Sequence, residues 1–172
     1  MFKFIAVSFA LVLCVFAQAQ VVEKRLKEMG IVLPDNARPI ANYVSAVRTG
    51  NLLFLAGKGP LKAPGEYITG KVGKDLTPEQ AYDAARLTGI LQLAAIKDAI
   101  GNLDKVKRIV KVLGMVNCSA DFTDHPKVIN GFSDLMVEVF GDKGKHARSS
   151  VGMNSLPGNM AVEIELIVEI DD

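Results

Sequence analysis

The alternation of side chains near the C-terminus constrains the fold of this chain more than any other feature. Apolar and acidic residues alternate along the segment Val162-Glu163-Ile164-Glu165-Leu166-Ile167-Val168-Glu169-Ile170. Residues two apart share one face of an extended strand, so Glu163, Glu165 and Glu169 lie together, opposite an apolar face. A strand with one apolar face belongs to a sheet that is covered on one side. We therefore expect helices over the apolar face and an uncovered face that carries the carboxylates.

A second segment with polar residues two apart precedes this strand. Arg148, Ser150, Gly152 and Asn154 share one face of this segment, opposite Val151 and Met153, and a Leu156-Pro157-Gly158-Asn159 turn follows. We interpret the two segments as a hairpin that places Arg148 on the same uncovered face as Glu163. An arginine beside a positioned carboxylate can hold an anionic substrate and activate a water molecule. The alternative is that these charges only line a solvated face, as on many half-buried strands.

The rest of the chain alternates between strand and helix patterns. Thr77, Pro78 and Gln80 form a capping-box signature at a helix start, and Gly101 is a typical helix end. Apolar residues at helical spacing mark a second helix that begins near Asp124 and stops at Gly141. The expected elements are a short helix at 21–30, a loop at 33–39, strands at 40–47 and 52–57, a helix at 77–101, a strand at 106–117, a helix at 124–141 and the hairpin.

This order predicts an α+β sandwich of β-β-α-β-α-β-β topology, in which two helices pack on one mixed sheet. No linker or repeat interrupts residues 40–172, which we interpret as a single domain after an N-terminal helix and loop at 20–39. Ile167 interrupts the polar row on the uncovered face. A partly apolar sheet face without helices is often an interface between subunits.

The first 19 residues have the pattern of a secretory signal peptide. Lys3 precedes an apolar run at 4–16, and Ala17-Gln18-Ala19 is a small-x-small cleavage site. We expect cleavage after Ala19 and export to a periplasmic or extracellular location, with no stable membrane span afterwards. The alternative is an uncleaved membrane anchor, although the run is short for a bilayer.

Charge and composition exclude several classes of function. Loss of residues 1–19 removes Lys3 and no acid, which leaves 19 of the 20 basic residues against 19 acidic ones. A neutral chain is not expected to bind nucleic acid. Cys118 then has no cysteine to pair with, and we interpret it as a small buried hydrophobe. With His125 and His146 as the only histidines and no recognisable partner for either, no metal site is expected.

Several of these segments resemble the Rid family, also called the YjgF or endoribonuclease L-PSP family. The resemblance covers residues 41–170, and the segment Gly70-Lys71-Val72-Gly73 is similar to a less-characterised branch related to the RidA enzymes. The motifs that carry it are Ala41-Asn42-Tyr43-Val44, Asn51-Leu52-Leu53-Phe54-Leu55-Ala56-Gly57, Lys127-Val128-Ile129-Asn130-Gly131, Ala147-Arg148-Ser149-Ser150-Val151, Leu156-Pro157 and Val162-Glu163-Ile164-Glu165.

The resemblance implies a chorismate-mutase-like fold, a homotrimer and ligand clefts between subunits. It also implies hydrolysis of 2-imino acids to 2-oxo acids and ammonia, without a cofactor. Carried over by position, Arg148 would hold the substrate carboxylate and Glu163 would position or activate the attacking water. The residues implied to line the cleft are Tyr43, Gly57, Asn130 and Ser150, with Ser150 where those enzymes often have a cysteine.

Two departures from the family pattern affect this reading. Ala56 stands where a serine is common and removes a hydroxyl, and Lys58 stands where a glutamine is usual and adds a charge. Three functions therefore remain open: hydrolysis of 2-imino or enamine acids, binding of a small carboxylate without turnover, and cleavage of RNA with inhibition of translation. Neutral charge and the lack of a histidine pair argue against the third.

Overall fold

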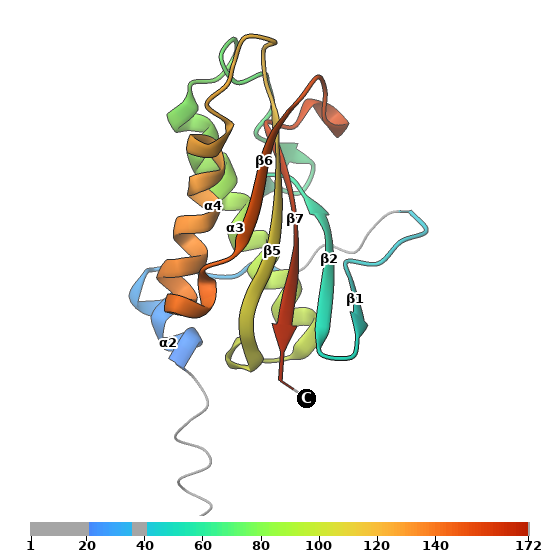
Figure 1. Cartoon of the computed structure of the whole chain (residues 1–172), viewed down its shortest axis with the longest axis vertical. Helices are drawn as coiled ribbons and strands as arrows, with labels where there is room; N and C mark the ends of the chain where they lie inside the picture. The colour runs from blue at the N-terminus through green and yellow to red at the C-terminus, as the bar shows by residue number, and fades with distance from the viewer. Residues whose placement is uncertain (1–20, 36–40, 172) are drawn as a thin grey trace, which may run out of the picture.

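The computed structural model describes residues 21–35 and 41–171, so the expected signal segment at 1–19 lies outside the described residues. Within those two ranges, no helix is both long and apolar enough to cross a membrane. The expected α+β arrangement is confirmed: helices cover one face of a mixed sheet and leave the other face without helices (Figure 1).

Five strands form the main sheet, in the spatial order β1-β2-β7-β5-β6. β1, β2, β7 and β5 pair antiparallel with their neighbours, whereas β6 pairs parallel with β5. The last strand of the chain is therefore inserted between β2 and β5. The strands are β1 (Ala46–Thr49), β2 (Leu52–Lys58), β5 (Val106–Asn117), β6 (Ala147–Met153) and β7 (Val162–Ile170).

Two long helices, α3 (Pro78–Ile100) and α4 (His125–Phe140), lie side by side on this sheet (Figure 1). The predicted capping box at Thr77 and Gln80 is present at the start of α3. A shorter helix, α2 (Val21–Glu28), packs near the end of α4. Between helices and sheet lies an apolar core whose largest fully buried side chains include Phe132, Leu93, Ile96, Ile109 and Ile164.

Strand boundaries differ from the prediction at the N-terminal edge of the sheet. We expected a strand at 40–47, but β1 begins only at Ala46 and residues 41–45 are not in a strand, while Ile40 lies outside the described residues. Between β2 and α3 the chain forms two further short strands, β3 (Leu61–Ala63) and β4 (Glu66–Tyr67), which pair with each other as a separate small sheet.

The predicted hairpin of the last two strands is wrong, because β5 lies between β6 and β7. The segment between them is eight residues long, and tight hairpins use two to five. β5, α4 and β6 instead form a strand–helix–strand crossover, which is how parallel neighbours are joined. Pairing across this crossover places Val112 opposite Arg148 and Gly114 opposite Ser150.

The Gly70-Lys71-Val72-Gly73 segment lies against the end of β5 and helps hold the connection that follows β6. The Val72 amide donates to the Asn117 carbonyl at 2.8 Å. The Lys71 ammonium donates to Asn117 Oδ1 at 3.2 Å, to the Cys118 carbonyl at 3.4 Å and to the Asn154 carbonyl. One lysine thus ties three separate segments at this end of the sheet.

The close approach of α3 and α4 depends on Gly131. A Cβ atom at this position would overlap the backbone carbonyl of Tyr82, which cannot move aside without shifting the helix. We therefore expect Gly131→Ala to lower the free energy of unfolding by about 3 kcal/mol in chemical denaturation.

The matched control is Gly89→Ala, a glycine in the facing helix. There the added carbon would meet the end of the flexible Leu135 side chain at 2.7 Å, and alanine favours helix by about 1 kcal/mol. This variant should stay within about 1 kcal/mol of wild type. Equal losses in the two variants would contradict a backbone contact at Gly131.

Candidate functional site

The three carboxylates expected on one face of β7 lie on the uncovered face of the sheet, and they have different surroundings. The intervening positions from Val162 to Ile170 are buried under the helices, whereas Glu163 and Glu169 are half-buried and Glu165 is exposed. Alternation therefore predicted the face correctly. It did not predict which carboxylate is available for chemistry.

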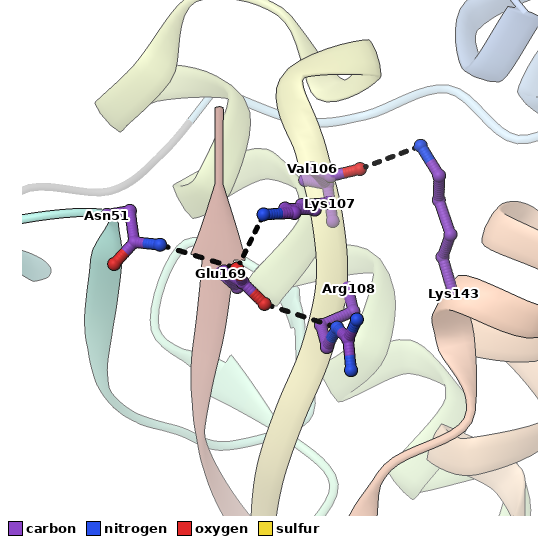
Figure 2. Close-up of polar contacts among 6 residues, drawn as sticks. All are labelled: Asn51, Val106, Lys107, Arg108, Lys143 and Glu169. Carbon is purple, nitrogen blue, oxygen red and sulfur yellow. Dashed lines mark hydrogen bonds and ion pairs between the residues drawn. The ribbon is translucent and has the colours of Figure 1, made fainter. Parts of the chain in front are cut away.

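Glu169 of β7 is engaged in a polar cluster with two residues of β5 and one in the turn before β2 (Figure 2). Its carboxylate contacts Lys107 Nζ at 2.9 Å and Arg108 Nε at 3.1 Å, and it accepts a hydrogen bond from Asn51 at 3.3 Å. The hydrogen bond from Lys107 lowers the pKa of Glu169. Glu169 is thus held ionised and occupied, which suits a structural role.

Glu163 has the opposite environment. Among the described residues it forms no ion pair. Burial raises the pKa of its carboxyl, and the nearby negative charge of Glu165 raises it further. A carboxylate whose pKa is raised toward physiological pH is a better general base there than an ordinary surface carboxylate.

A bulge in β2 brings Gly57 against Glu163. β2 pairs Leu55 with Leu166 and Lys58 with Ile164, so β2 has one residue more than β7 across this interval. Any Cβ at Gly57 would overlap the Glu163 carboxylate. Only glycine therefore leaves the space that this carboxylate occupies.

Gln92, which had no place among the predicted site residues, contacts this bulge from the helix side of the sheet. Its side chain is fully buried on α3, and its amide nitrogen donates to the Ala56 carbonyl at 2.9 Å and to the Ile164 carbonyl at 2.7 Å. These carbonyls flank Gly57 and Glu163 in their strands. A signal existed in the sequence, because Gln92 interrupts the apolar stripe of its helix four residues after Thr88.

Tyr43 and Lys58 lie near the same bulge. Tyr43 is exposed, just before β1, where the Ser45 carbonyl accepts from the Ala56 amide at 3.0 Å. Lys58 is paired with the buried Ile164 and therefore lies on the helix side of the sheet. Burial lowers the pKa of Lys58 and the charge of Asp98 on α3 opposes this shift, so its charge is directed to the helix layer and not toward Glu163.

Arg148 lies at the opposite edge of the sheet and contacts α4. Its Nη1 atom donates to Asn130 Oδ1 at 2.9 Å and to Ser133 Oγ at 2.9 Å. Two residues further along β6, the Ser150 hydroxyl is buried and has no hydrogen-bond partner among the described residues. Arg148, Asn130 and Ser150 therefore lie where β6 meets α4, and Ser133 is an addition that the sequence did not reveal.

The prediction that Arg148 and Glu163 share a face is wrong for a single protomer. Arg148 pairs with Val112, which is buried under the helices, whereas Glu163 pairs with Met115 on the other side of the sheet. β5 also separates the two strands, a distance of about 10 Å, and the pairs are three residues apart along it, about another 10 Å. The strand–helix–strand pattern of residues 106–153 was the signal that could have revealed this.

One protomer therefore presents two incomplete groups. The Glu163 half-site comprises Tyr43, Gly57 and Glu163, and the Arg148 half-site comprises Asn130, Arg148 and Ser150. The first offers a carboxylate with a raised pKa, and the second offers a guanidinium with a free hydroxyl nearby. Each half is chemically useful for a small carboxylate only if the other is supplied to it.

Cys118 is buried, as predicted, but it does have a histidine neighbour. His125 Nε2 lies 3.4 Å from its sulfur, which corrects the expectation that neither histidine has a recognisable partner. Burial raises the pKa of the thiol, so it stays protonated and is a poor nucleophile. Within residues 21–35 and 41–171, no three His, Cys, Asp or Glu side chains cluster as metal ligands would.

Gln92→Met tests whether the buried amide secures the bulge. Methionine keeps the volume but cannot donate to the two carbonyls, so we expect a loss of about 2–3 kcal/mol in unfolding free energy. Thr88→Val is the control, since its hydroxyl bonds only the Ala84 carbonyl of its own helix. A cost for Gln92→Met no larger than that for Thr88→Val would contradict this role.

The raised pKa of Glu163 also makes a prediction about stability against pH. The folded state favours the protonated carboxyl of Glu163. Its contribution to the stability of the protein is therefore complete below the ordinary carboxyl pKa and is lost as the pH rises through the raised pKa of the folded state. The melting temperature of Glu163→Gln should therefore be higher than that of wild type at pH 7–8 and equal to it at pH 4. Glu169→Gln should melt below wild type at pH 7–8, because that carboxylate is stabilised when ionised.

Comparisons with known proteins agree with this architecture. Residues 23–170 match the family described as "YjgF/chorismate mutase-like, putative endoribonuclease". A solved structure from Agrobacterium tumefaciens, of a protein described as having unknown function, is 43% identical with a TM-score of 0.82. That match covers 90% of this chain and 97% of the other. The chorismate-mutase-like fold implied by the resemblance is confirmed.

Two curated relatives extend the match. Protein TCP17 of Trypanosoma cruzi is 41% identical over 152 residues, covering 88% of this chain and 95% of that protein. A 2-iminobutanoate/2-iminopropanoate deaminase of Dermatophagoides farinae is 32% identical over 142 residues, covering 82% and 95%. With a family model over nearly the whole described chain and relatives of full length, this protein belongs to the Rid (YjgF) family.

Proposed function

We propose that this protein hydrolyses small 2-imino or enamine acids to 2-oxo acids and ammonia, in clefts formed between subunits of a homotrimer. The observation that carries the proposal is the division of the site. A guanidinium and a carboxylate of raised pKa occupy opposite faces of one protomer. The deaminase relative supports the choice of reaction.

The uncovered sheet face supports assembly from several copies. Four of its apolar side chains are at least one-third exposed in the protomer. Exposed apolar side chains gathered on one face are typical of a surface that contacts another protein. Ile167 lies among them and interrupts the row of carboxylates. The four exposed residues are Val47, Phe54, Val151 and Met153.

A head-to-tail contact between copies accounts for both half-sites. It would bring the Glu163 half-site of one subunit to the Arg148 half-site of the next, and repetition of that contact closes a ring. In a three-membered ring each subunit contributes to two clefts. Three equivalent clefts result, each complete and each shared.

In such a cleft the chemistry needs little beyond positioning. Arg148 holds the substrate carboxylate, and the Ser150 hydroxyl is free to bond the adjacent nitrogen. Glu163 accepts a proton from the water that attacks C2 and passes it to the imine nitrogen, which gives an amino alcohol. The hydroxyl proton of this intermediate then moves to the nitrogen, the C–N bond breaks, and ammonia leaves as the carbonyl forms. The sum is one imino acid and one water to one oxo acid and one ammonia.

Binding of a small carboxylate without turnover is the second candidate. Ala56 supplies no hydroxyl beside Gly57, so a ligand in the cleft has one hydrogen-bonding group fewer than the family pattern provides. The Arg148 half-site would still hold the carboxylate. Export of the mature chain, away from the cytosolic enzymes that generate imines, is likewise a proposal and favours this candidate.

Hydrolysis of freshly generated 2-iminopropanoate and 2-iminobutanoate tests the main proposal. Purified protein should accelerate ammonia release, and Arg148→Ala or Glu163→Gln should lower kcat/KM by at least about 100-fold. Arg108→Ala is the matched control, because this arginine pairs with Glu169 outside the half-sites. Absence of acceleration by the assembled trimer would leave carboxylate binding as the function.

Mixing the two inactive variants tests whether the cleft is shared. Co-refolded Arg148→Ala and Glu163→Gln subunits, in equal amounts, should recover about one quarter of wild-type activity, because about that fraction of clefts receives an intact residue from each neighbour. A site within one protomer would recover nothing. The assembled mass, measured by light scattering, confirms that mixing has taken place.

A further inference from the structure

The guanidinium of Arg148 is already half occupied. Its Nη1 atom carries two hydrogens, and two acceptors, Asn130 Oδ1 and Ser133 Oγ, each lie 2.9 Å from it. Both Nη1 hydrogens are therefore used inside the protomer. Three donors remain, one on Nε and two on Nη2, and two of them lie side by side along the edge formed by Nε and Nη2.

Ser133 can accept from Arg148 because its own proton is directed elsewhere. His146 Nδ1 lies 2.7 Å from the Gly144 carbonyl, which can only accept, so Nδ1 carries the imidazole proton. Nε2 of the neutral ring is then an acceptor, and it lies 3.0 Å from Ser133 Oγ. The hydroxyl donates to His146 and leaves its lone pairs for Arg148.

The environment of His146 favours this neutral form. Burial lowers its pKa, and the positive charge of Arg148, two residues further along the chain, acts in the same direction. The edge of its ring packs against Phe132, at a centroid distance of 6.3 Å. The Gly144 carbonyl on one side and the Ser133 hydroxyl on the other thus fix the orientation and the tautomer of the His146 ring.

We propose that His146 and Ser133 are positioning residues that fix Arg148 so that only its Nε–Nη2 edge faces the ligand. A carboxylate would then be held by two parallel hydrogen bonds from that edge, in a single orientation. The ligand part of this inference rests on the proposed function. The positioning itself is a property of the protein without ligand and is tested separately.

The first test needs no ligand. In protein labelled with ¹⁵N at histidine and arginine, NMR should show His146 protonated at Nδ1 only, and slow rotation of the Arg148 guanidinium. Ser133→Ala should speed that rotation, and Ser133→Thr, which keeps the hydroxyl, should retain it. Protonation at Nε2, or unchanged rotation in Ser133→Ala, would overturn the proposal.

The second test measures the effect on substrate binding. A clamp that acts on substrate and transition state alike changes KM more than kcat. We expect His146→Leu and Ser133→Ala to raise KM about 10-fold, corresponding to about 1.4 kcal/mol, with kcat within a factor of two. His146→Gln should restore most of the affinity, because its side-chain oxygen can replace Nε2 as the acceptor.

Controls separate positioning from stability and from the proposed reaction. His125→Leu removes the histidine beside Cys118 and should leave KM unchanged. If wild type proves inactive, pyruvate in a thermal-shift titration replaces the substrate, and the same variants should weaken its stabilising effect. Loss of kcat without a change of KM, or equal effects in His146→Gln and His146→Leu, would overturn the proposal while leaving the deaminase proposal in place.

Discussion

The pairing of β5 on both of its sides is the constraint on which the rest of this structure depends. β7 pairs with one edge of β5 in antiparallel register and β6 with the other in parallel register. These registers place Glu163 on the open face of the sheet and Arg148 on the helix side. The same strand therefore fixes the core and the placement of the two half-sites on opposite faces, and a side-chain rotation cannot bring either half-site to the other face.

Local patterns predicted most of the elements, because they depend on short-range chemistry. The capping box at Thr77 and the alternation along β7 lie within a few residues of the features they explain. Strand pairing is different, since it joins segments far apart in the chain. The motifs identify Arg148 and Glu163 individually, but they do not predict that the two residues lie on opposite faces. Ser133 has no sequence signal, because its contact with Arg148 exists only where α4 meets β6.

Neighbouring charges, and not residue type, distinguish the two half-buried carboxylates of β7. Glu169 is neutralised by Lys107 and Arg108 at one end of the strand, and Glu163 is half-buried without a cation at the other. The ion pairs of Glu169 join two strands, whereas Glu163 remains a carboxylate that can accept a proton. A repeated acidic pattern thus divides into structural and chemical roles through the strands on either side, which a sequence read by itself does not contain.

The bulge at Gly57 has a consequence for how such a site can change over evolutionary time. Because the Glu163 carboxylate fills the space where any other side chain would begin, a larger residue at this position would displace that carboxylate. New ligand preferences must arise from positions beside it, such as Ala56 and Tyr43, whose side chains can vary. In the proposed cleft, the residue that accepts the proton and the residues that select the ligand would therefore be neighbours that can diverge independently.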